Sequence, residues 1–245
     1  MVEAFAVASG KGGTGKTTTT LALGMALAKE YDVTVIDADT GMANLLFHAG
    51  LDDVEVTLHD LLVTDTDIAI SEAVYERFGM SVIPCGTSLT AFAAANPAQL
   101  RAVVSTLATE TDIILLDSPA AIGSKSAVLP IILASLSDGL KVQEYAHSYK
   151  TETAGVIFNR VRQDESVATI AEQASRYFGG PILAHVPERD VVRAARRQGE
   201  PLLAHAPDDI AASAFREAAA SLEINDKTAN AVANRFKSAV IPEQP

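Results

Sequence analysis

The chain has 245 residues, of which 48% are apolar, and a formal net charge of −12. This is enough apolar material for one large α/β core, and neither a Pro/Ser/Gly-rich linker nor an internal repeat divides the sequence. A surface this acidic repels a polyanion, so the charge argues against DNA as a partner. No apolar run is long enough to cross a membrane, and the N-terminus leads straight into a predicted strand, so we expect neither a membrane-spanning helix nor a signal peptide. The single Cys85 excludes a disulfide scaffold and indicates a reducing compartment, which predicts a cytoplasmic protein.

A glycine-rich segment follows the first apolar run, Ala4 to Ala8. It reads Gly10-Lys11-Gly12-Gly13-Thr14-Gly15-Lys16-Thr17 and fits G-x-x-x-x-G-K-[ST] at every fixed position. The small residues let backbone N–H groups converge on one point, and a helix predicted to begin at Lys16 adds the positive end of its dipole. The pattern therefore predicts a polyphosphate site. Lys16 would lie against the β- and γ-phosphates, and the Thr17 hydroxyl would ligate Mg²⁺.

Lys11 is the unusual residue of this segment, because an ordinary phosphate loop has no requirement for a lysine there. The string Lys11-Gly12-Gly13-Thr14-Gly15-Lys16-Thr17-Thr18 resembles the deviant Walker A motif of the MinD/ParA family of ATPases. The resemblance implies a P-loop NTPase fold, an α/β architecture with a doubly wound, mostly parallel sheet flanked by helices. It also implies ATP and Mg²⁺ as cofactors, with residues 10 and 12–18 around the nucleotide. In that family the extra lysine reaches the nucleotide of a second subunit, so Lys11 and Lys16 would both be catalytic in an ATP-dependent homodimer.

An acidic segment follows the strand-like residues Val33 to Ile36. Acidic residues at the carboxyl end of a strand lie where open α/β sheets bind ligands. The sequence Asp37-Ala38-Asp39-Thr40-Gly41 resembles the first switch of the same family, which implies that Asp39 positions the attacking water. Asp37 is either a helper to Asp39 or a residue that forms the turn.

A second acidic segment follows the apolar run Ile113 to Leu116. Asp117-Ser118-Pro119-Ala120-Ala121 resembles the second switch of the family, and Asp117 would hold Mg²⁺ through water, as a Walker B acid does. Ala121 stands where the family has glycine. Alanine has less backbone freedom than glycine, so this residue restricts the loop at the place where the family's loop should change conformation in response to the γ-phosphate.

Two later residues resemble the adenine site of the family. Asn159 ends the strand-like segment 155–160, where its amide would read the adenine edge or, alternatively, cap the following turn. Pro187 follows the next strand-like segment, 182–186, in the position of the family's loop over the base. The resemblance runs to residue 224, so we expect a P-loop ATPase domain over residues 1–224 and a separate tail over residues 225–245.

One interval departs from the family pattern. Between Asp117 and Asp138 there is a single apolar run, where the family fits a helix and then another core strand. A strand at Val128 to Leu133 would leave a crossover of only ten residues, barely the length that a connection between parallel strands needs, and Pro130 would lie in the middle of the strand. We therefore predict a helix from Ser126 to Ala134 and a sheet that lacks one strand.

The C-terminal tail shows helical periodicity. Its apolar residues are Ala229, Val232, Ala233, Phe236 and Val240. This spacing is typical of an amphipathic helix, and bacterial MinD proteins end in a basic helix of this kind that binds membranes. With one aromatic residue and three cations, the tail leaves two alternatives open, a packed or frayed helix and a peripheral contact with a membrane surface.

Three functional classes remain. The favoured class is a MinD-like ATPase switch that hydrolyses ATP to ADP and phosphate, pairs on ATP and places or releases a protein partner in cell division or at the cell surface. The alternatives are a ParA-type DNA-partition ATPase, which the acidic charge disfavours, and a scaffold that binds ATP with little or no hydrolysis. An iron–sulfur carrier is disfavoured because two chains with one cysteine each supply two of the four thiolates that a bridging cluster needs.

Overall fold

The computed structural model describes residues 2–9, 12–39, 43–118, 129–134, 153–162 and 180–225, and the structural description is confined to these ranges. Within them, no helix has both the length and the apolar character needed to span a membrane.

The described residues form an eight-stranded sheet with the order β3-β4-β2-β5-β1-β6-β7-β8. Every neighbouring pair is parallel except β3 and β4, which form an antiparallel hairpin at one edge. The strands are β1 (Glu3–Ala8), β2 (Val33–Asp37), β3 (Tyr75–Arg77), β4 (Met80–Ile83), β5 (Ile113–Asp117), β6 (Leu129–Ala134), β7 (Gly155–Val161) and β8 (Ile182–Pro187). The α/β class and the mostly parallel sheet are therefore confirmed.

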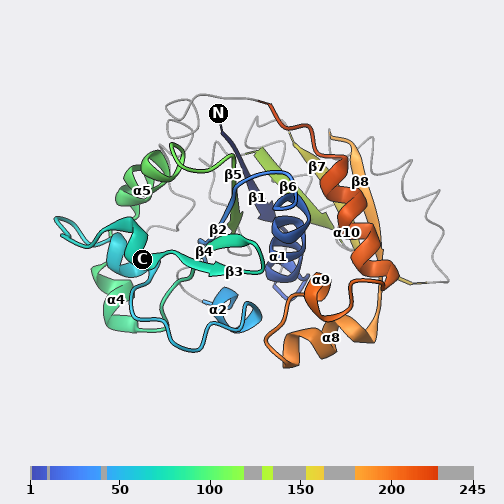
Figure 1. Cartoon of the computed structure of the whole chain (residues 1–245), viewed down its shortest axis with the longest axis horizontal. Coiled ribbons are helices and arrows are strands. Elements are labelled where there is room, and N and C mark those ends of the chain that lie inside the picture. Colours follow the sequence, from blue (N-terminus) through green and yellow to red (C-terminus); the bar gives the residue numbers. More distant parts are fainter. Residues whose placement is uncertain are drawn as a thin grey trace.

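Helices lie on both faces of this sheet (Figure 1). The described α-helices are α1 (Lys16–Leu27), α2 (Leu45–His48), α3 (Leu58–Leu61), α4 (Leu89–Ala94), α5 (Leu100–Leu107), α8 (Asp190–Arg197), α9 (Leu202–His205) and α10 (Ile210–Ala220). Two short 3₁₀ helices, η1 (Ile70–Ala73) and η2 (Pro97–Gln99), complete the described part.

The alternation of side chains along the central strands divides the core into two layers. Phe5, Val35 and Leu115 pack with residues of α1 and α10, whereas Ala6 and Ile114 pack with α3 and α5 on the opposite face. Successive residues of a strand point to opposite faces, so a strand buried on both faces is a continuous apolar run. This is why the apolar runs of the sequence located β1, β2 and β5 correctly.

The predictions of a helix over residues 129–134 and of a sheet that lacks one strand are both wrong, while residues 126–128 lie outside the described residues. Residues 129–134 are not helical but form β6, which lies inside the sheet between β1 and β7. Pro130 is the second residue of this strand and pairs with Ala6 of β1, while the ladder to β7 begins one residue later, at Ile131. A proline near the start of a strand, before the second ladder begins, is compatible with a missing N–H. The rule that prolines avoid central strands was therefore applied too strictly.

The topology brings several strand ends to one edge of the sheet. β1 lies between β5 and β6, and the register pairs Asp37 of β2 with Asp117 of β5, and Val7 of β1 with Asp117. The loop between β1 and α1 follows at the same carboxyl edge, where open α/β sheets bind their ligands. The sheet thus places Asp37, Asp117 and the start of this loop at the carboxyl ends of its central strands.

Candidate functional site

The loop between β1 and α1 is built on glycines in left-handed conformations. Gly13 has φ of 74° and Gly15, which caps the N-terminus of α1, has φ of 100°. Only glycine adopts these angles without strain. Helix α1 begins at Lys16, as predicted, and carries no acidic residue in its first turn. The unpaired N–H groups of that turn and the positive end of the helix dipole therefore remain available to an anion.

Ser9 accepts two side-chain hydrogen bonds from the loop, a role that was not predicted from the sequence. The Thr14 hydroxyl donates to Ser9 Oγ over 2.8 Å, and Lys16 Nζ donates to the same oxygen over 3.4 Å. Ser9 is 5% exposed, so the bond from Thr14 is buried, whereas the bond from Lys16 is partly buried. The signal was its position, since a hydroxyl residue lies between the end of the strand and the first glycine of the loop.

Asp117 lies beside the first turn of α1. Its carboxylate accepts a hydrogen bond from the Thr17 side chain and a long one, 3.5 Å, from the Thr20 hydroxyl. Burial raises the pKa of Asp117 to about 6, although the bond from Thr17 and the nearby Lys16 charge act in the opposite direction. A buried carboxylate that resists ionisation in this way calls for a cation to stabilise its charged form.

Asp37 ties together the two ends of the loop that follows β2. Its carboxylate accepts from the Asp39 N–H over 3.1 Å and from the Leu45 N–H, at the start of α2, over 3.2 Å. The side chain is fully buried, and burial, followed by the nearby Asp117 carboxylate, raises its pKa well above the usual range. Of the two roles expected for Asp37, these hydrogen bonds support the turn-forming one, in which the side chain anchors the loop.

The remaining predicted residues occupy the same edge of the sheet. Asp39 is partly exposed and contributes to the raised pKa of Asp117, so the two carboxylates are close. Ser118 fixes the start of the second switch segment, because its hydroxyl donates to the Val7 carbonyl oxygen over 2.5 Å. Asn159 at the end of β7 donates to the Thr14 carbonyl oxygen over 2.8 Å. Pro187 ends β8 in register with Val161.

Several predicted features lie outside the described residues. They are Gly10 and Lys11 in the loop, residues 40–42 of the first switch, residues 119–128 including Ala121, and the tail from Asp226 onward. The roles assigned to Lys11, to Ala121 and to the amphipathic tail stay predictions.

Replacing Asp117 by asparagine should stabilise the ligand-free protein at neutral pH. The folded-state pKa of about 6 lies above the ordinary value of 3.8, so the wild-type chain loses stability as the pH rises from about 4 through 6. Asparagine resembles the protonated carboxyl group and has no such loss. Thermal melts in EDTA should show Asp117→Asn melting about 5 °C higher than wild type at pH 7.5.

The same melts at pH 4 should bring the two curves together, because the wild-type carboxyl group is then protonated. Asp53→Asn, which removes an exposed carboxylate, is the matched control and should shift the melting temperature by little at either pH. A wild-type protein that is more stable than Asp117→Asn at pH 7.5 in EDTA would contradict the assignment of a destabilising buried charge.

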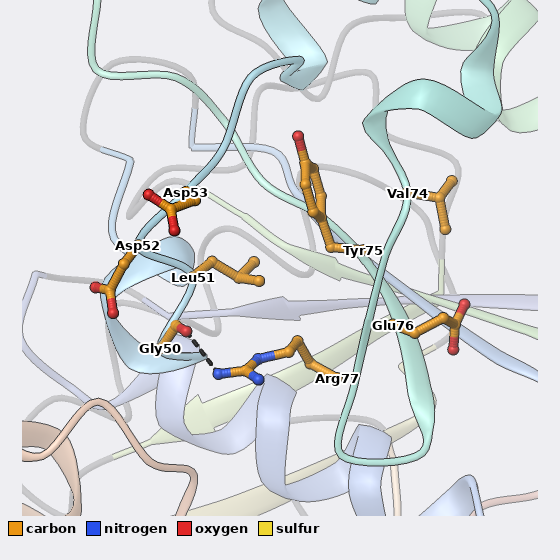
Figure 2. Close-up of a pocket in the computed structure, with 8 residues that line it drawn as sticks. All are labelled: Gly50, Leu51, Asp52, Asp53, Val74, Tyr75, Glu76 and Arg77. Carbon is orange, nitrogen blue, oxygen red and sulfur yellow. Dashed lines mark hydrogen bonds between the residues drawn. The ribbon is translucent and has the colours of Figure 1, made fainter.

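A hollow of about 420 Å³ lies between β3 and the loop after α2 (Figure 2). Its acidic lining comes from Asp52, Asp53 and Glu76, while the Arg77 side chain reaches across and donates to the Gly50 carbonyl oxygen over 2.6 Å. None of the residues that line this hollow belongs to the loop between β1 and α1 or to the predicted switches. The hollow therefore contains none of the residues to which the sequence assigned nucleotide or metal binding.

Comparison with known proteins agrees with the geometry at the sheet edge. Residues 5–202 match the family described as the CobQ/CobB/MinD/ParA nucleotide binding domain. An uncharacterized ATP-binding protein of Methanocaldococcus jannaschii is 39% identical over 235 residues, which cover 91% of this chain and 88% of that protein.

Two solved structures have the same fold. The septum site-determining protein MinD of Pyrococcus horikoshii, complexed with Mg-ADP, matches with a TM-score of 0.76 at 31% identity, over 89% of this chain and 95% of that one. The cell division ATPase MinD of Pyrococcus furiosus matches with a TM-score of 0.79 at 29% identity, over 90% of this chain and 98% of that one. Since the family model spans residues 5–202 and the Methanocaldococcus jannaschii protein is 39% identical over most of both chains, the chain belongs to the CobQ/CobB/MinD/ParA family of P-loop nucleotide-binding proteins.

Proposed function

We propose that this chain is a Mg-ATP-dependent ATPase that acts as a dimerising switch of the MinD kind, hydrolysing ATP to ADP and phosphate. The observation that carries the proposal is the position of Asp117. It lies buried beside Thr17 and Lys16, the first two residues of α1, which the glycine loop precedes. A phosphate cradle with a buried acid beneath it is the arrangement that P-loop enzymes use for a nucleotide and its metal ion.

The oxygen atoms of Thr17 and Asp117 are of the kind that Mg²⁺ prefers as ligands. The Thr17 hydroxyl and the Asp117 carboxylate are hard oxygen donors, and Mg²⁺ in nucleotide sites keeps several waters and takes phosphate oxygens as further ligands. When bound, Mg²⁺ neutralises the charge on the β- and γ-phosphate oxygens. A bound cation would also stabilise the ionised form of Asp117, whose pKa burial raises to about 6.

The protein residues have separable roles in this proposal. Backbone N–H groups of residues 13–17 and the Lys16 ammonium group bind and orient the phosphates. Asp39 orients the attacking water, and Asp37 holds the loop that carries Asp39 by its two backbone hydrogen bonds. Asn159 and Pro187 contact adenine. An amide at this strand end favours ATP, since guanine recognition usually calls for a carboxylate that accepts from N1–H and N2–H.

Pairing of two copies is the part of the proposal that depends on Lys11. A lysine inside the phosphate loop is a solvated cation unless a second set of phosphates comes within reach. The two structural neighbours, a septum site-determining protein and a cell division ATPase, support a place in cell division or in another positioning process that involves a protein partner.

Sizing the protein with ADP and with ATP tests the dimer, and a steady-state ATPase assay run beside it tests hydrolysis. We expect monomers with Mg-ADP, dimers with Mg-ATP and measurable phosphate release. Dimers on ATP without turnover would favour the scaffold alternative. DNA binding that weakens steeply with salt would favour the ParA-type alternative, against which the net charge of −12 argues.

A further inference from the structure

Asn159 uses both ends of its amide to join β7 to the glycine loop. Its Nδ2 donates to the Thr14 carbonyl oxygen over 2.8 Å, and its Oδ1 accepts from the Arg160 N–H over 3.0 Å. One partner can only accept and the other can only donate. The amide therefore satisfies both bonds in one orientation and neither bond if it is flipped.

The backbone of β7 is distorted at the place that aims this amide. Arg160 has φ of 59°, a left-handed conformation that an arginine adopts only at a cost of about 1 kcal/mol or more. The register between β7 and β8 shifts between Asn159 and Val161, which marks a bulge. Bulges re-aim side chains at strand ends next to functional sites. Here the bulge turns the Arg160 N–H toward the Asn159 side chain.

The glycine loop is shaped to receive the amide. A Cβ atom at Gly15 would lie 2.7 Å from Asn159 Nδ2, a distance that real Cβ contacts do not reach. Thr14 is thereby held at both ends, with its hydroxyl bonded to Ser9 Oγ and its carbonyl oxygen bonded to Asn159. A continuous set of hydrogen bonds thus runs from the end of β1, through the loop, to the end of β7.

We propose that Asn159 is a positioning residue that braces the phosphate loop in addition to contacting the base. The inference rests on the proposed nucleotide binding and concerns how the site is held in shape. The two bonds use one of the two amide N–H groups and one of the two Oδ1 lone pairs. Among the described residues, the other N–H group and lone pair stay available for adenine. One side chain thus links the base end of the site to its phosphate end.

A ligand without a base separates the two roles. If Asn159 only reads adenine, its removal weakens ATP and leaves inorganic tripolyphosphate unaffected. If it also braces the loop, the N–H groups that form the phosphate cradle become less ordered, and both ligands bind more weakly. We expect Asn159→Ala to lower tripolyphosphate affinity roughly tenfold, the worth of one hydrogen bond of this kind, and ATP affinity by more.

The experiment is competition of Mg-tripolyphosphate and Mg-ATP against a fluorescent ATP analogue, on the full chain. Asn96→Ala is the matched control. Asn96 likewise donates through Nδ2 and accepts a backbone N–H at Oδ1, but its partners are Thr64 and Ala98 in an exposed segment away from the glycine loop. Asn96→Ala should leave both affinities unchanged. Unchanged tripolyphosphate affinity in Asn159→Ala, with weaker ATP binding, would overturn the brace.

A second measurement needs no ligand. Deuterium uptake over residues 12–19 of the nucleotide-free protein should be roughly three- to tenfold faster in Asn159→Ala than in wild type, because loop opening no longer breaks that bond. Uptake equal to that of wild type would overturn the brace. A wild-type protein that binds neither ligand would contradict the proposed function, while faster uptake in the variant would still support the brace.

Asn159→Ser serves as a second variant if Asn159→Ala does not fold. Circular dichroism of the ligand-free proteins checks this before any binding experiment. If neither variant folds, the proposal is overturned as well, because a brace confined to the loop should not decide whether the whole sheet forms.

Discussion

Lys16→Ala should abolish measurable Mg-ATP binding. The ammonium group of Lys16 lies at the start of α1, where it is held by Ser9 Oγ at 3.4 Å and lowers the pKa of Asp117 by its charge. Its removal leaves the phosphates with only the backbone N–H groups and the helix dipole as positive partners, while the buried acid remains. Charge-assisted contacts with phosphate are among the strong ones, so we expect a loss of at least about 100-fold, measured by calorimetry.

Lys29→Ala is the control for this experiment, because it removes an exposed lysine just beyond the other end of α1. It should bind ATP as wild type does. Thr17→Ala should weaken the dependence of binding on Mg²⁺ more than binding itself, since its hydroxyl contacts the Asp117 carboxylate rather than the Lys16 side chain. Normal ATP affinity in Lys16→Ala would mean that the glycine loop is not the nucleotide site.

The parts of the fold that the sequence predicted are those in which local pattern and tertiary environment agree. β1, β2 and β5 are buried on both faces, so they read as largely apolar runs, and β2 and β5 end in Asp37 and Asp117. The start of α1 was predictable for a similar reason. The glycine pattern of the loop and the helix N-terminus that follows it both favour a bound anion, so the local pattern and the expected site agree.

β6 was missed because two local rules pointed away from the structure. The interval between Asp117 and the strand is short, and Pro130 argued against a central strand. Which backbone groups of a strand need partners depends on where each neighbour begins to pair. Here β7 begins to pair at Ile131, one residue after the proline. A single sequence does not contain that register.

The bond between Asn159 and Thr14 was unpredictable for a different reason. The two residues are 145 positions apart, and the contact depends on a bulge with a left-handed arginine, which no propensity favours. Sequence reasoning placed Asn159 at the correct end of the correct strand. It assigned the amide to the adenine edge or to a cap on the following turn, and not to the glycine loop, because that loop belongs to another part of the chain.

Lys11→Ala and Asp39→Ala should have opposite effects, and together they decide whether the switch works by pairing. Lys11, which lies outside the described residues, acts across the dimer in the proposed function. Lys11→Ala should therefore bind ATP through Lys16 and the loop, since these groups belong to the same subunit, but fail to neutralise the phosphates of the second copy. We expect it to stay monomeric and inactive with Mg-ATP.

In the proposed function, Asp39 positions water only after the two copies have closed on each other. Asp39→Ala should bind ATP and pair, while turnover falls by roughly 10²–10⁴-fold, the usual worth of a positioned general base. Asp37 should keep its bond to the Leu45 N–H in this variant. The loop therefore stays anchored, and the variant should lose hydrolysis without losing ATP binding or pairing. The expected product is a trapped ATP dimer.

Light scattering with ATP and Mg²⁺ on both variants, with phosphate release measured on the same samples, checks these outcomes. Asp53→Ala, which removes an exposed carboxylate outside the site, controls for the loss of a negative charge and should behave as wild type. Normal dimerisation of Lys11→Ala would remove the lysine from the pairing step. Hydrolysis by a wild-type protein that remains a strict monomer would leave an ordinary P-loop ATPase, because a lysine that acts across an interface has no role without one.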